Sequence, residues 1–350
     1  MEGLSSRREI VAVRSSPPLD GHPRQARRVA NMPRVVYLGP EGTFSEQAAR
    51  ALGRAEVLPG GSALAPSATI DEAVRAVSGT SDAEPTAELA VVPVENSVEG
   101  SVVATLDALS SGAPTVAVAE TVLPVRFSVL TRPGTTLDRV RTVATHPHAA
   151  AQVRNWLAEN VPRAAVLPST STAAAARSVR DGEVDASVST PVAAEHYGLA
   201  AVAEDVADVR HAETRFLLLS RPVAPPPPTG WDRTSIAVVL PNHPGSLAGA
   251  LHELALRDIS LSRIESRPTR NRLGEYRFFL DLDGHVGESR MADGLAALRR
   301  RCVTVRFLGS FAKADAIPRV HGPDEGRHTS DEVFAEASAW VRAVREGREV

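Results

Sequence analysis

A glycine-rich turn early in the chain is the first place where residue types and spacing indicate chemistry. In "GPEGTFSEQAA" (39–49) the two glycines are three residues apart, and no lysine follows. Phosphate-binding loops need G-x-x-x-x-G-K-[ST] and dinucleotide turns need G-x-G-x-x-G, so both are excluded. Thr43 and Glu46 have the spacing of a helix capping box. The turn therefore predicts a capped helix, whose free N–H groups near Thr43 and Ser45 also suit a carboxylate.

Two other clusters of small polar residues follow predicted strands. "VPVENSVEGS" (92–101) places Asn96 and Ser97 after an apolar run, which fits either a polar turn with Asx hydrogen bonds or a ligand-binding loop. "STSTAAAARSV" opens an alanine-rich helix with four hydroxyl side chains: Ser169, Thr170, Ser171 and Thr172. One of them is expected to cap the helix. The others are either alternative caps or ligands of a second anion.

The segment "HAETRFLLL" (211–219) places Thr214, Arg215 and Phe216 at the start of an apolar strand. A threonine hydroxyl is a poor free acid, but in a dry site it can donate to a leaving hydroxyl and share that proton in the transition state. Arginine in such a position is more often an ion-pair partner, and phenylalanine more often belongs to the core. Thr214 is therefore the candidate for general acid chemistry.

Histidines and nucleophiles give weaker signals. His146 and His148 lie two residues apart in "THPHAAAQ". No further acid or histidine follows at a telling distance, so a structural turn is favoured over a metal site. No serine or cysteine has an evident histidine and carboxylate beside it, so the pattern does not indicate covalent hydrolysis.

The elements that must position these residues alternate between strand and helix. From residue 34 to residue 221, short apolar runs are followed by helix patterns, such as those over 44–53 and 69–79. Pro124 interrupts the strand-forming stretch 115–134. This alternation predicts an α/β region with largely parallel sheets, in which ligands bind beyond the carboxyl ends of the strands.

A proline-rich linker, "PVAPPPPTGWD" (222–232), separates this region from one of different pattern. Residues 233–311 read as βαββαβ, the ferredoxin-like unit. Residues 312–350 form a polar tail with at most one helix, over 330–346. Residues 1–33 are expected to be a disordered extension. Met32, directly before the first strand, is the natural start that we expect, and a transit peptide is the alternative.

The bulk composition excludes several classes of protein. The chain has 350 residues, of which 43% are hydrophobic, and a net charge of −3. It therefore carries no overall basic field for nucleic acid. A single cysteine, Cys302, cannot form an internal disulfide. No apolar stretch approaches the roughly 18 residues of a membrane span. A cytoplasmic protein is expected, without nucleic-acid or membrane partners.

Taken in chain order, these segments resemble the signature blocks of the prephenate dehydratase family. The blocks are "GPEGTFSEQAA", "VPVENSVEGS", "THPHAAAQ", "STSTAAAA" and "TRF". The C-terminal βαββαβ unit resembles the ACT regulatory domain of that family. The resemblance runs from residue 34 to about residue 311. Single blocks are weak signals, but five in order, followed by the ACT segments, are highly specific.

The resemblance implies a catalytic domain over 34–221 with two α/β lobes, like a periplasmic binding protein, and substrate in the cleft. It implies a hydro-lyase that converts prephenate to phenylpyruvate, CO2 and water in phenylalanine biosynthesis, without a metal or organic cofactor. Thr214 is the implied proton donor to the departing ring hydroxyl, and Phe216 lies near the ring. The implied ligands of the two substrate carboxylates are Thr43, Ser45, Asn96, Ser97, Ser169, Thr170, Ser171, Thr172 and Arg215.

The ACT resemblance also implies regulation. "PGSLAGAL" and "IESRP" are similar to the two segments that hold phenylalanine in the family. They correspond to Gly245, Ser246, Leu247 and Ala248 and to Glu265, Ser266, Arg267 and Pro268. Feedback inhibition by L-phenylalanine at an interface between two ACT domains is therefore expected, in a homodimer or homotetramer.

The chain departs from the family pattern at three places. Ala212 stands where the family often has asparagine, and His148 stands where it often has glutamine. The block commonly written GALV is "GSLA" here, with its small residues kept. No chorismate mutase domain is expected, because 33 residues before the catalytic region are too few.

Two other functions fit the same blocks. An arogenate dehydratase acts on a substrate with an amine in place of the keto group, and the blocks barely separate it from a prephenate dehydratase. A non-catalytic amino-acid sensor would pair a solute-binding-like fold with an ACT domain. The hydroxyl of Thr214 distinguishes an enzyme from a sensor, since a sensor does not need it.

Overall fold

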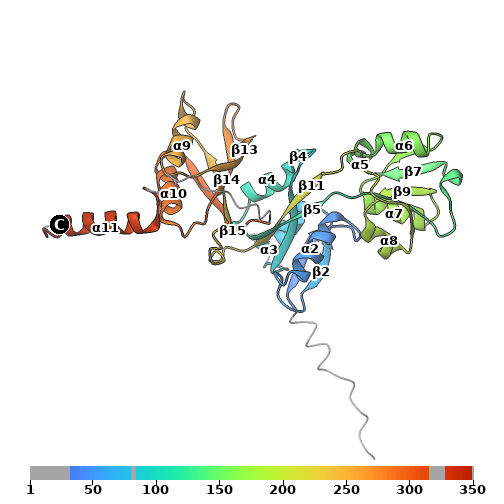
Figure 1. The fold of residues 1–350 in the computed structure, drawn as a ribbon, viewed down its shortest axis with the longest axis horizontal. Coiled ribbons are helices and arrows are strands. Elements are labelled where there is room, and N and C mark those ends of the chain that lie inside the picture. Colours follow the sequence, from blue (N-terminus) through green and yellow to red (C-terminus); the bar gives the residue numbers. More distant parts are fainter. Residues whose placement is uncertain (1–31, 80–83, 315–327, 349–350) are drawn as a thin grey trace, which may run out of the picture. The chain divides into compact units, whose positions relative to one another are not determined.

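The computed structural model describes residues 32–79, 84–314 and 328–348. The predicted N-terminal extension lies almost wholly outside the described residues. Within them the chain forms two α/β lobes, a four-stranded domain and a final helix (Figure 1). This confirms the predicted fold class, but the prediction of largely parallel sheets was wrong, since both lobe sheets mix parallel and antiparallel pairs. No described helix is long and apolar enough to cross a membrane.

The first lobe is built from two parts of the chain. Its strands and helices are β1 (Arg34–Leu38), α2 (Phe44–Arg54), β2 (Ala63–Ser67), α3 (Ile70–Ser78), β3 (Leu89–Asn96), β4 (Gly100–Ser101), α4 (Val103–Ser110), β5 (Val116–Pro124) and β11 (Glu213–Ser220). The strand order is β2-β1-β3-β11-β5, with β4 paired to β3. Strands β1, β2 and β3 are parallel, whereas β11 runs antiparallel to both neighbours. The returning strand β11 therefore lies inside the sheet.

The two faces of this sheet carry separate cores. Tyr37, Leu52 and Phe216 belong to the cluster under α2. Val92, Leu106 and Leu217 belong to the cluster that packs with α3 and α4 and extends to the C-terminal domain. Because side chains alternate along a strand, neighbouring residues of β11 contribute to different cores.

The second lobe is inserted between β5 and β11. It contains β6 (Ser128–Thr131), the 3-10 helix η1 (Leu137–Arg139), β7 (Thr142–Thr145), α5 (Pro147–Gln152), α6 (Arg154–Asn160), β8 (Ala165–Pro168), α7 (Thr172–Arg180), β9 (Ala186–Ser189), α8 (Pro191–Tyr197) and β10 (Ala200–Ala203). Its sheet has the order β10-β6-β9-β7-β8. The two chain crossings between the lobes lie side by side, since the Val125 N–H donates to the Ala212 carbonyl at 2.7 Å.

The C-terminal domain has the predicted βαββαβ order. Its elements are β12 (Asp232–Val239), α9 (Ser246–Ala255), β13 (Leu261–Pro268), β14 (Tyr276–Asp283), α10 (Ser289–Arg301) and β15 (Thr304–Ala312). The antiparallel order β13-β14-β12-β15 is that of the ferredoxin-like fold. Its own core is apolar and includes Ile236, Leu254, Leu280 and Leu298.

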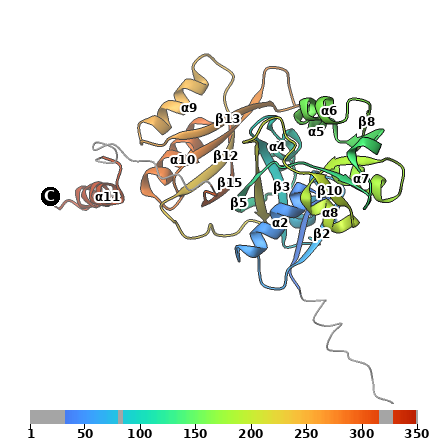
Figure 2. The same cartoon turned by 45° about the vertical axis from the view of Figure 1, so that its right-hand side comes forward.

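This domain continues the sheet of the first lobe through a single rung. Strand β15 pairs in parallel with β5 at Gly309 and Ala117. A Cβ on Gly309 would lie 2.2 Å from the Ala117 carbonyl oxygen, and Gly309 has φ +141. Only glycine fits such a close backbone approach at that φ. Figure 2 shows the strands of the domain beside those of the lobe.

Beyond the ferredoxin-like unit the chain forms α11 (Asp331–Arg345). Asp331 accepts a hydrogen bond from the Ser289 N–H at 2.7 Å, and the Thr329 hydroxyl donates to Asp258 at 3.1 Å. These two contacts join the C-terminal segment to α10 and to the turn after α9. The helix falls where the sequence pattern admits one.

Candidate active site

The hydroxyl of Thr214 is held by one defined partner. Thr214 is the first residue of β11 that pairs with β3, and it faces Asn96 in the register. The Asn96 side-chain amide donates to Thr214 Oγ1 at 2.9 Å. Asn96 Oδ1 accepts the N–H groups of Val98 and Glu99, each at 2.9 Å, which fixes the orientation of the amide. Within the described residues the hydroxyl hydrogen of Thr214 has no acceptor, so it is available to a ligand.

Ser97 joins the loop after β3 to the start of β11. Its backbone N–H donates to the Glu213 carbonyl at 2.9 Å, and its Oγ accepts the Glu213 N–H at 2.9 Å. The loop that carries Asn96 and Ser97 is thus held by two bonds to Glu213, the residue directly before Thr214. A buried strand end with fixed polar neighbours is a suitable place for a preorganised donor.

The glycine-rich turn forms the predicted helix cap in modified form. Thr43 Oγ1 accepts the Glu46 N–H at 3.4 Å and donates to the Leu38 carbonyl at 2.9 Å. The Glu46 carboxylate does not return to Thr43 but accepts the Gly42 N–H at 2.6 Å. The N–H groups of Phe44 and Ser45, at the positive end of the α2 dipole, have no acceptor within the described residues.

Helix α8 of the second lobe packs directly on this turn. The Thr190 hydroxyl donates to the Gly42 carbonyl at 2.7 Å, and the Tyr197 hydroxyl donates to the Glu41 carbonyl at 3.0 Å. His196 Nε2 lies 2.8 Å from a Glu46 carboxylate oxygen. A Cβ on Gly42, which has φ +84, would lie 3.1 Å from Ala193 Cα. The turn is therefore a contact between lobes.

The carboxylate of Glu46 is the charged centre of this contact. It also pairs with Arg50 at 2.7 Å, and its side chain is only 4% exposed. Burial raises the pKa of Glu46, but the bonds from Gly42 and His196 and the charge of Arg50 outweigh burial, so the pKa lies below its ordinary value. Glu46 is thus ionised near neutral pH and holds two lobes together. The sequence indicated only that Glu46 takes part in capping a helix, and not that it contacts the second lobe.

A second set of contacts joins the lobes at the loop after β3. Gln152 Nε2 donates to a Glu99 carboxylate oxygen at 3.3 Å, and His148 Nδ1 lies 3.2 Å from the other. His146 caps α5 through Nδ1, which accepts the His148 N–H at 3.3 Å. Burial and the nearby His148 lower the pKa of His146. No group of three or more potential metal ligands occurs within the described residues.

The four hydroxyl residues of the second lobe lie at the start of α7. Ser171 is the N-cap and accepts the Ala174 N–H at 2.9 Å. The Ser169 N–H donates to the Thr145 carbonyl at 2.8 Å, which joins this segment to the end of β7. Ser169 and Thr170 precede the cap, and Thr172 begins the helix. No hydrogen bond among the described residues links this group to Thr214.

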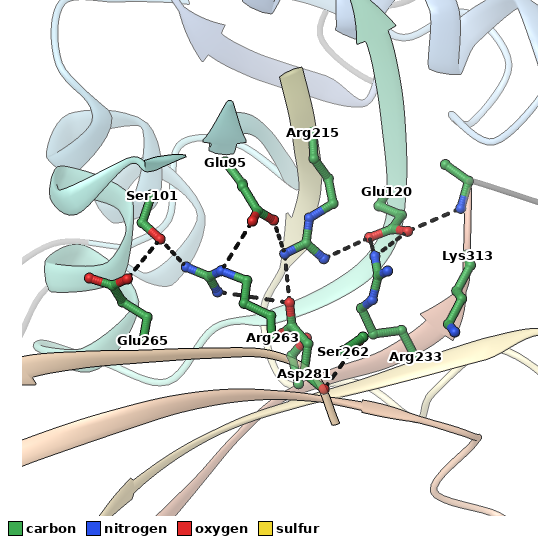
Figure 3. Close-up of polar contacts among 12 residues, drawn as sticks. Glu95, Ser101, Glu120, Arg215, Arg233, Ser262, Arg263, Glu265, Asp281 and Lys313 are labelled. Atoms are coloured by element: carbon green, nitrogen blue, oxygen red, sulfur yellow. Dashed lines mark hydrogen bonds and ion pairs between the residues drawn. The ribbon is translucent and has the colours of Figure 1, made fainter. Parts of the chain in front are cut away.

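The guanidinium of Arg215 lies within a cluster of charged side chains (Figure 3). Its guanidinium contacts Asp281 at 2.6 Å, Glu120 at 3.2 Å and Glu95 at 3.2 Å, and its side chain is 8% exposed. Burial lowers the pKa of Arg215, but these carboxylates outweigh burial and raise it. The three ion pairs favour a structural role for Arg215 over direct binding of a substrate carboxylate.

Two predicted neighbours of the site are apolar and buried. Phe216 is 1% exposed and packs in the core under α2, which favours packing over contact with a substrate ring. Ala212, at the position where an asparagine was expected, is 1% exposed and belongs to the core of the second lobe. An apolar residue suits that place.

Residues that the sequence analysis missed share one signal. Glu120 and Asp281 are acids inside otherwise apolar strand patterns, "TVAVAETVLP" and "RFFLDLDGH". Their side chains are 0% and 6% exposed. A charged residue within an apolar strand is rarely buried unless it is paired. That pattern indicates a buried ion pair, but it does not identify the partner, which lies elsewhere in the chain.

In the C-terminal domain, the two predicted amino-acid-binding segments lie at separate places. Gly245, with φ +81, is the N-cap of α9, and the Ser246 hydroxyl donates to the His243 carbonyl at 2.9 Å. Leu247 and Ala248 follow in the first turn. Glu265, Ser266, Arg267 and Pro268 lie on β13, the edge strand. Strand β14 lies between β13 and β12, from which the loop to α9 departs.

A two-lobed α/β region with an available hydroxyl at a strand end, joined to a ferredoxin-like domain, defines a two-lobed α/β enzyme with an attached regulatory-type domain. The sequence profile of prephenate dehydratase matches residues 35–224, and that of the ACT domain matches residues 234–299. The chain therefore belongs to the prephenate dehydratase family, the hydro-lyases that form phenylpyruvate in phenylalanine biosynthesis. The family resemblance of the sequence blocks is confirmed.

Individual relatives agree with this assignment. Prephenate dehydratase of Amycolatopsis methanolica is 53% identical over 320 residues, which cover 91% of this chain and 100% of that protein. The crystal structure of prephenate dehydratase from Arthrobacter aurescens in complex with L-Phe is 42% identical, covers 89% of this chain and 99% of that chain, and has a TM-score of 0.80. GqqA, described as a novel type of quorum quenching acylase, is 29% identical, with a TM-score of 0.69 and coverage of 81% and 98%.

Proposed function

We propose that Thr214 is the proton donor of the reaction. The carrying observation is the 2.9 Å bond from the Asn96 amide to Thr214 Oγ1, which leaves the hydroxyl hydrogen for the substrate. When the carboxylate on the prephenate ring leaves as CO2, its bonding electrons enter the ring and the C4 hydroxyl departs. The departing oxygen takes up a proton that Thr214 donates, and solvent replaces that proton. Water, CO2 and phenylpyruvate are the products.

The two substrate carboxylates fit the two lobes. The free N–H groups of Phe44 and Ser45, with the hydroxyl of Thr43 nearby, suit one carboxylate at the α2 terminus. The start of α7, with Ser169, Thr170 and Thr172 around the Ser171 cap, suits the other. Asn96 and Ser97 border Thr214. Holding the substrate from two lobes aligns its leaving groups with a fixed donor, which is how positioning accelerates a reaction.

Substitution of Thr214 tests the donor. Thr214→Ala should lower kcat by about 10²–10⁴-fold, the range of general acid catalysis, with KM little changed. Thr214→Ser keeps the hydroxyl and should retain much more activity. Steady-state assays of phenylpyruvate formation decide the point. If Thr214→Ala turned over prephenate at the wild-type rate, the proton would come from another group.

The substrate is proposed to be prephenate and not arogenate. The 53% identity to a prephenate dehydratase supports this choice. Parallel assays with both compounds test it, and a higher kcat/KM for arogenate would reverse it.

We also propose that L-phenylalanine binds the ACT domain and inhibits the enzyme. A 42% identical relative has been crystallised with L-Phe, and the residues expected to hold it are Gly245 to Ala248 and Glu265 to Pro268. Because β14 separates these segments within one chain, a ligand touching both fits an interface between two copies, in a homodimer or homotetramer. Calorimetry and sedimentation with and without L-phenylalanine test this. The single buried Cys302 supports a cytoplasmic location.

A further inference from the structure

A cluster of charged side chains joins the catalytic sheet to the ACT sheet directly behind Thr214. We call it the junction cluster: Glu95, Glu120, Arg215, Arg233, Arg263 and Asp281. Three arginines face three carboxylates, so the charges balance. Arg233 Nη1 lies 2.6 Å from both oxygens of Glu120, and the Ser235 hydroxyl donates to Asp281 at 2.7 Å. Figure 3 shows these residues between the strands of the two domains.

The register places this cluster one rung away from the catalytic residues. Thr214 pairs with Asn96, and Arg215 pairs with Glu95. Successive side chains lie on opposite faces of the sheet, so the first rung faces the site and the second faces the ACT domain. Arg215 and Glu95 are themselves ion-paired at 3.2 Å. A change that displaces this pair therefore acts on residues directly adjacent to Thr214 and Asn96 in the chain.

A serine hydroxyl links the same loop to the proposed phenylalanine-binding strand. Ser101 of β4 pairs with Glu95 in the register. Its hydroxyl donates to Glu265 at 3.2 Å and accepts a bond from Arg263 Nη2 at 2.8 Å. Arg263 and Glu265 lie two residues apart on β13 and so share a face. Arg263 also lies 3.8 Å from both Glu95 and Asp281, within reach but not in close contact.

We propose that the ACT domain controls catalysis through Ser101 and the junction cluster, with Arg215 as a positioning residue for Thr214. This rests on the proposed function. An ammonium group that binds Glu265 competes with the neutral Ser101 hydroxyl, and bonds to charged partners are the stronger. Released from the bridge, Arg263 moves toward Glu95 and Asp281. Glu95 is then drawn from Arg215, and the adjacent Thr214–Asn96 rung shifts away from its active geometry.

The bridge is tested with Ser101→Ala in the full-length chain. Prephenate turnover without effector should fall toward that of phenylalanine-inhibited wild type, because loss of the hydroxyl releases Arg263 from the bridge as the effector does. The calorimetric affinity for L-phenylalanine should change only a few-fold, whereas its inhibition should weaken by about fivefold or more, the lower range of allosteric coupling. Ser110→Ala is the matched control, since Ser110 bonds only to the Asp107 carbonyl within α4. It should leave inhibition unchanged.

The positioning role is tested with Arg215→Lys, which keeps the charge but loses the multiple fixed donors. We expect kcat to fall about tenfold with KM nearly unchanged, as for a misplaced catalytic group. In a Thr214→Ala background the same substitution should have no further effect on kcat. Additive losses in the double variant would assign Arg215 a merely structural role.

The outcomes separate this inference from the proposed function. Wild-type protein that forms no phenylpyruvate would overturn the proposed function. An active wild type that phenylalanine does not inhibit would overturn the inference. So would a Ser101→Ala variant that binds L-phenylalanine and is inhibited as strongly as wild type, while Thr214→Ala still abolishes turnover.

Discussion

Two of the contacts that the first lobe makes with the rest of the chain differ in their chemistry. Toward the ACT domain it presents the junction cluster, in which Asp281 and Glu120 are almost fully buried. Toward the second lobe it presents the turn around Gly42, held by hydroxyl-to-carbonyl bonds and by Glu46. There the partners His196 and Arg50 have side chains 23% and 37% exposed.

The difference sets the cost of separating each contact. The pairs of the junction cluster are costly to disturb, because removing one partner leaves an uncompensated buried charge at about 3–5 kcal/mol. Opening the lobe contact would part Glu46 from His196 but leave its pair with Arg50 on the same helix. Each hydroxyl-to-carbonyl bond would be exchanged for one with water, at about 0.5–1.5 kcal/mol. The lobes can therefore part at lower cost than the domains. A cleft that must admit substrate and release product needs the weaker contact between its lobes.

Among the substitutions that test this difference, Asp281→Ala is expected to have the largest effect on stability. It leaves Arg215 buried without its shortest partner, at 2.6 Å, and should lower the free energy of unfolding by about 3–5 kcal/mol. Burial raises the pKa of Asp281, but Arg215, Arg263 and Arg233 outweigh burial and lower it, so the wild-type carboxylate is ionised.

Urea unfolding measures the change in Asp281→Ala. Asp71→Ala, which removes an exposed pair with Arg75, is the control and should cost at most about 1 kcal/mol. Equal effects of the two substitutions would contradict the distinction between a buried junction and an ordinary surface.

The next effect is expected from Gly309→Ala at the single rung between the sheets. The new Cβ would lie 2.2 Å from the Ala117 carbonyl, and backbone strain alone should cost about 1–3 kcal/mol. Gly134→Ala is the control, because Gly134 has φ +83 but no atom near its Cβ position. Hydrogen exchange at strand β5 should rise in the first variant only. Unchanged exchange there would mean that the rung does not join the sheets.

The smallest effect is expected from Glu46→Gln at the lobe contact. The pKa of Glu46 is below its ordinary value of 4.5, so its ionised form adds stability above that value. That contribution is lost as pH falls through the folded-state pKa. Wild type should exceed Glu46→Gln by about 1 kcal/mol near pH 7, and the gap should close in acid.

Thermal unfolding across pH measures this gap. Glu72→Gln is the control, because Glu72 has the same spacing to Thr69 on α3 but is exposed and accepts only the Ala68 N–H. If the stability difference between wild type and Glu46→Gln stayed constant down to about pH 3, the ionised carboxylate would not contribute to the lobe contact.

Much of the fold followed from local pattern. The helices predicted over 44–53 and 69–79 formed as α2 and α3, because the caps at Thr43 and Thr69 depend only on a few adjacent residues. Strand β2 was not predicted, since "ALAPS" is short and contains proline, and only its pairing with β1 makes it a strand. The antiparallel direction of β11 was also not predicted, because it depends on how the chain returns from the second lobe to the first sheet and not on the residues of β11.

The residues of the candidate site were indicated by the sequence, whereas the contacts between them were not. Thr214 and Asn96 were found from the sequence because a strand end with polar residues is a local signal. Their direct bond was not, because 118 residues separate them along the chain. The family resemblance predicted that Arg215 binds a substrate carboxylate. Its buried carboxylate partners lie on β3, β5 and β14, and only the fold brings these strands to Arg215.

The sequence by itself determined the family, the order of elements and the residue types available for chemistry, since these depend on spacing and periodicity. Tertiary structure alone decided which partner each polar group meets. The Gly42 turn became a contact between lobes because α8 packs on it, and the Thr214 hydroxyl kept its hydrogen free because Asn96 faces it. Such pairings join residues far apart in the chain, and only the packing of sheets and helices brings them within hydrogen-bonding distance.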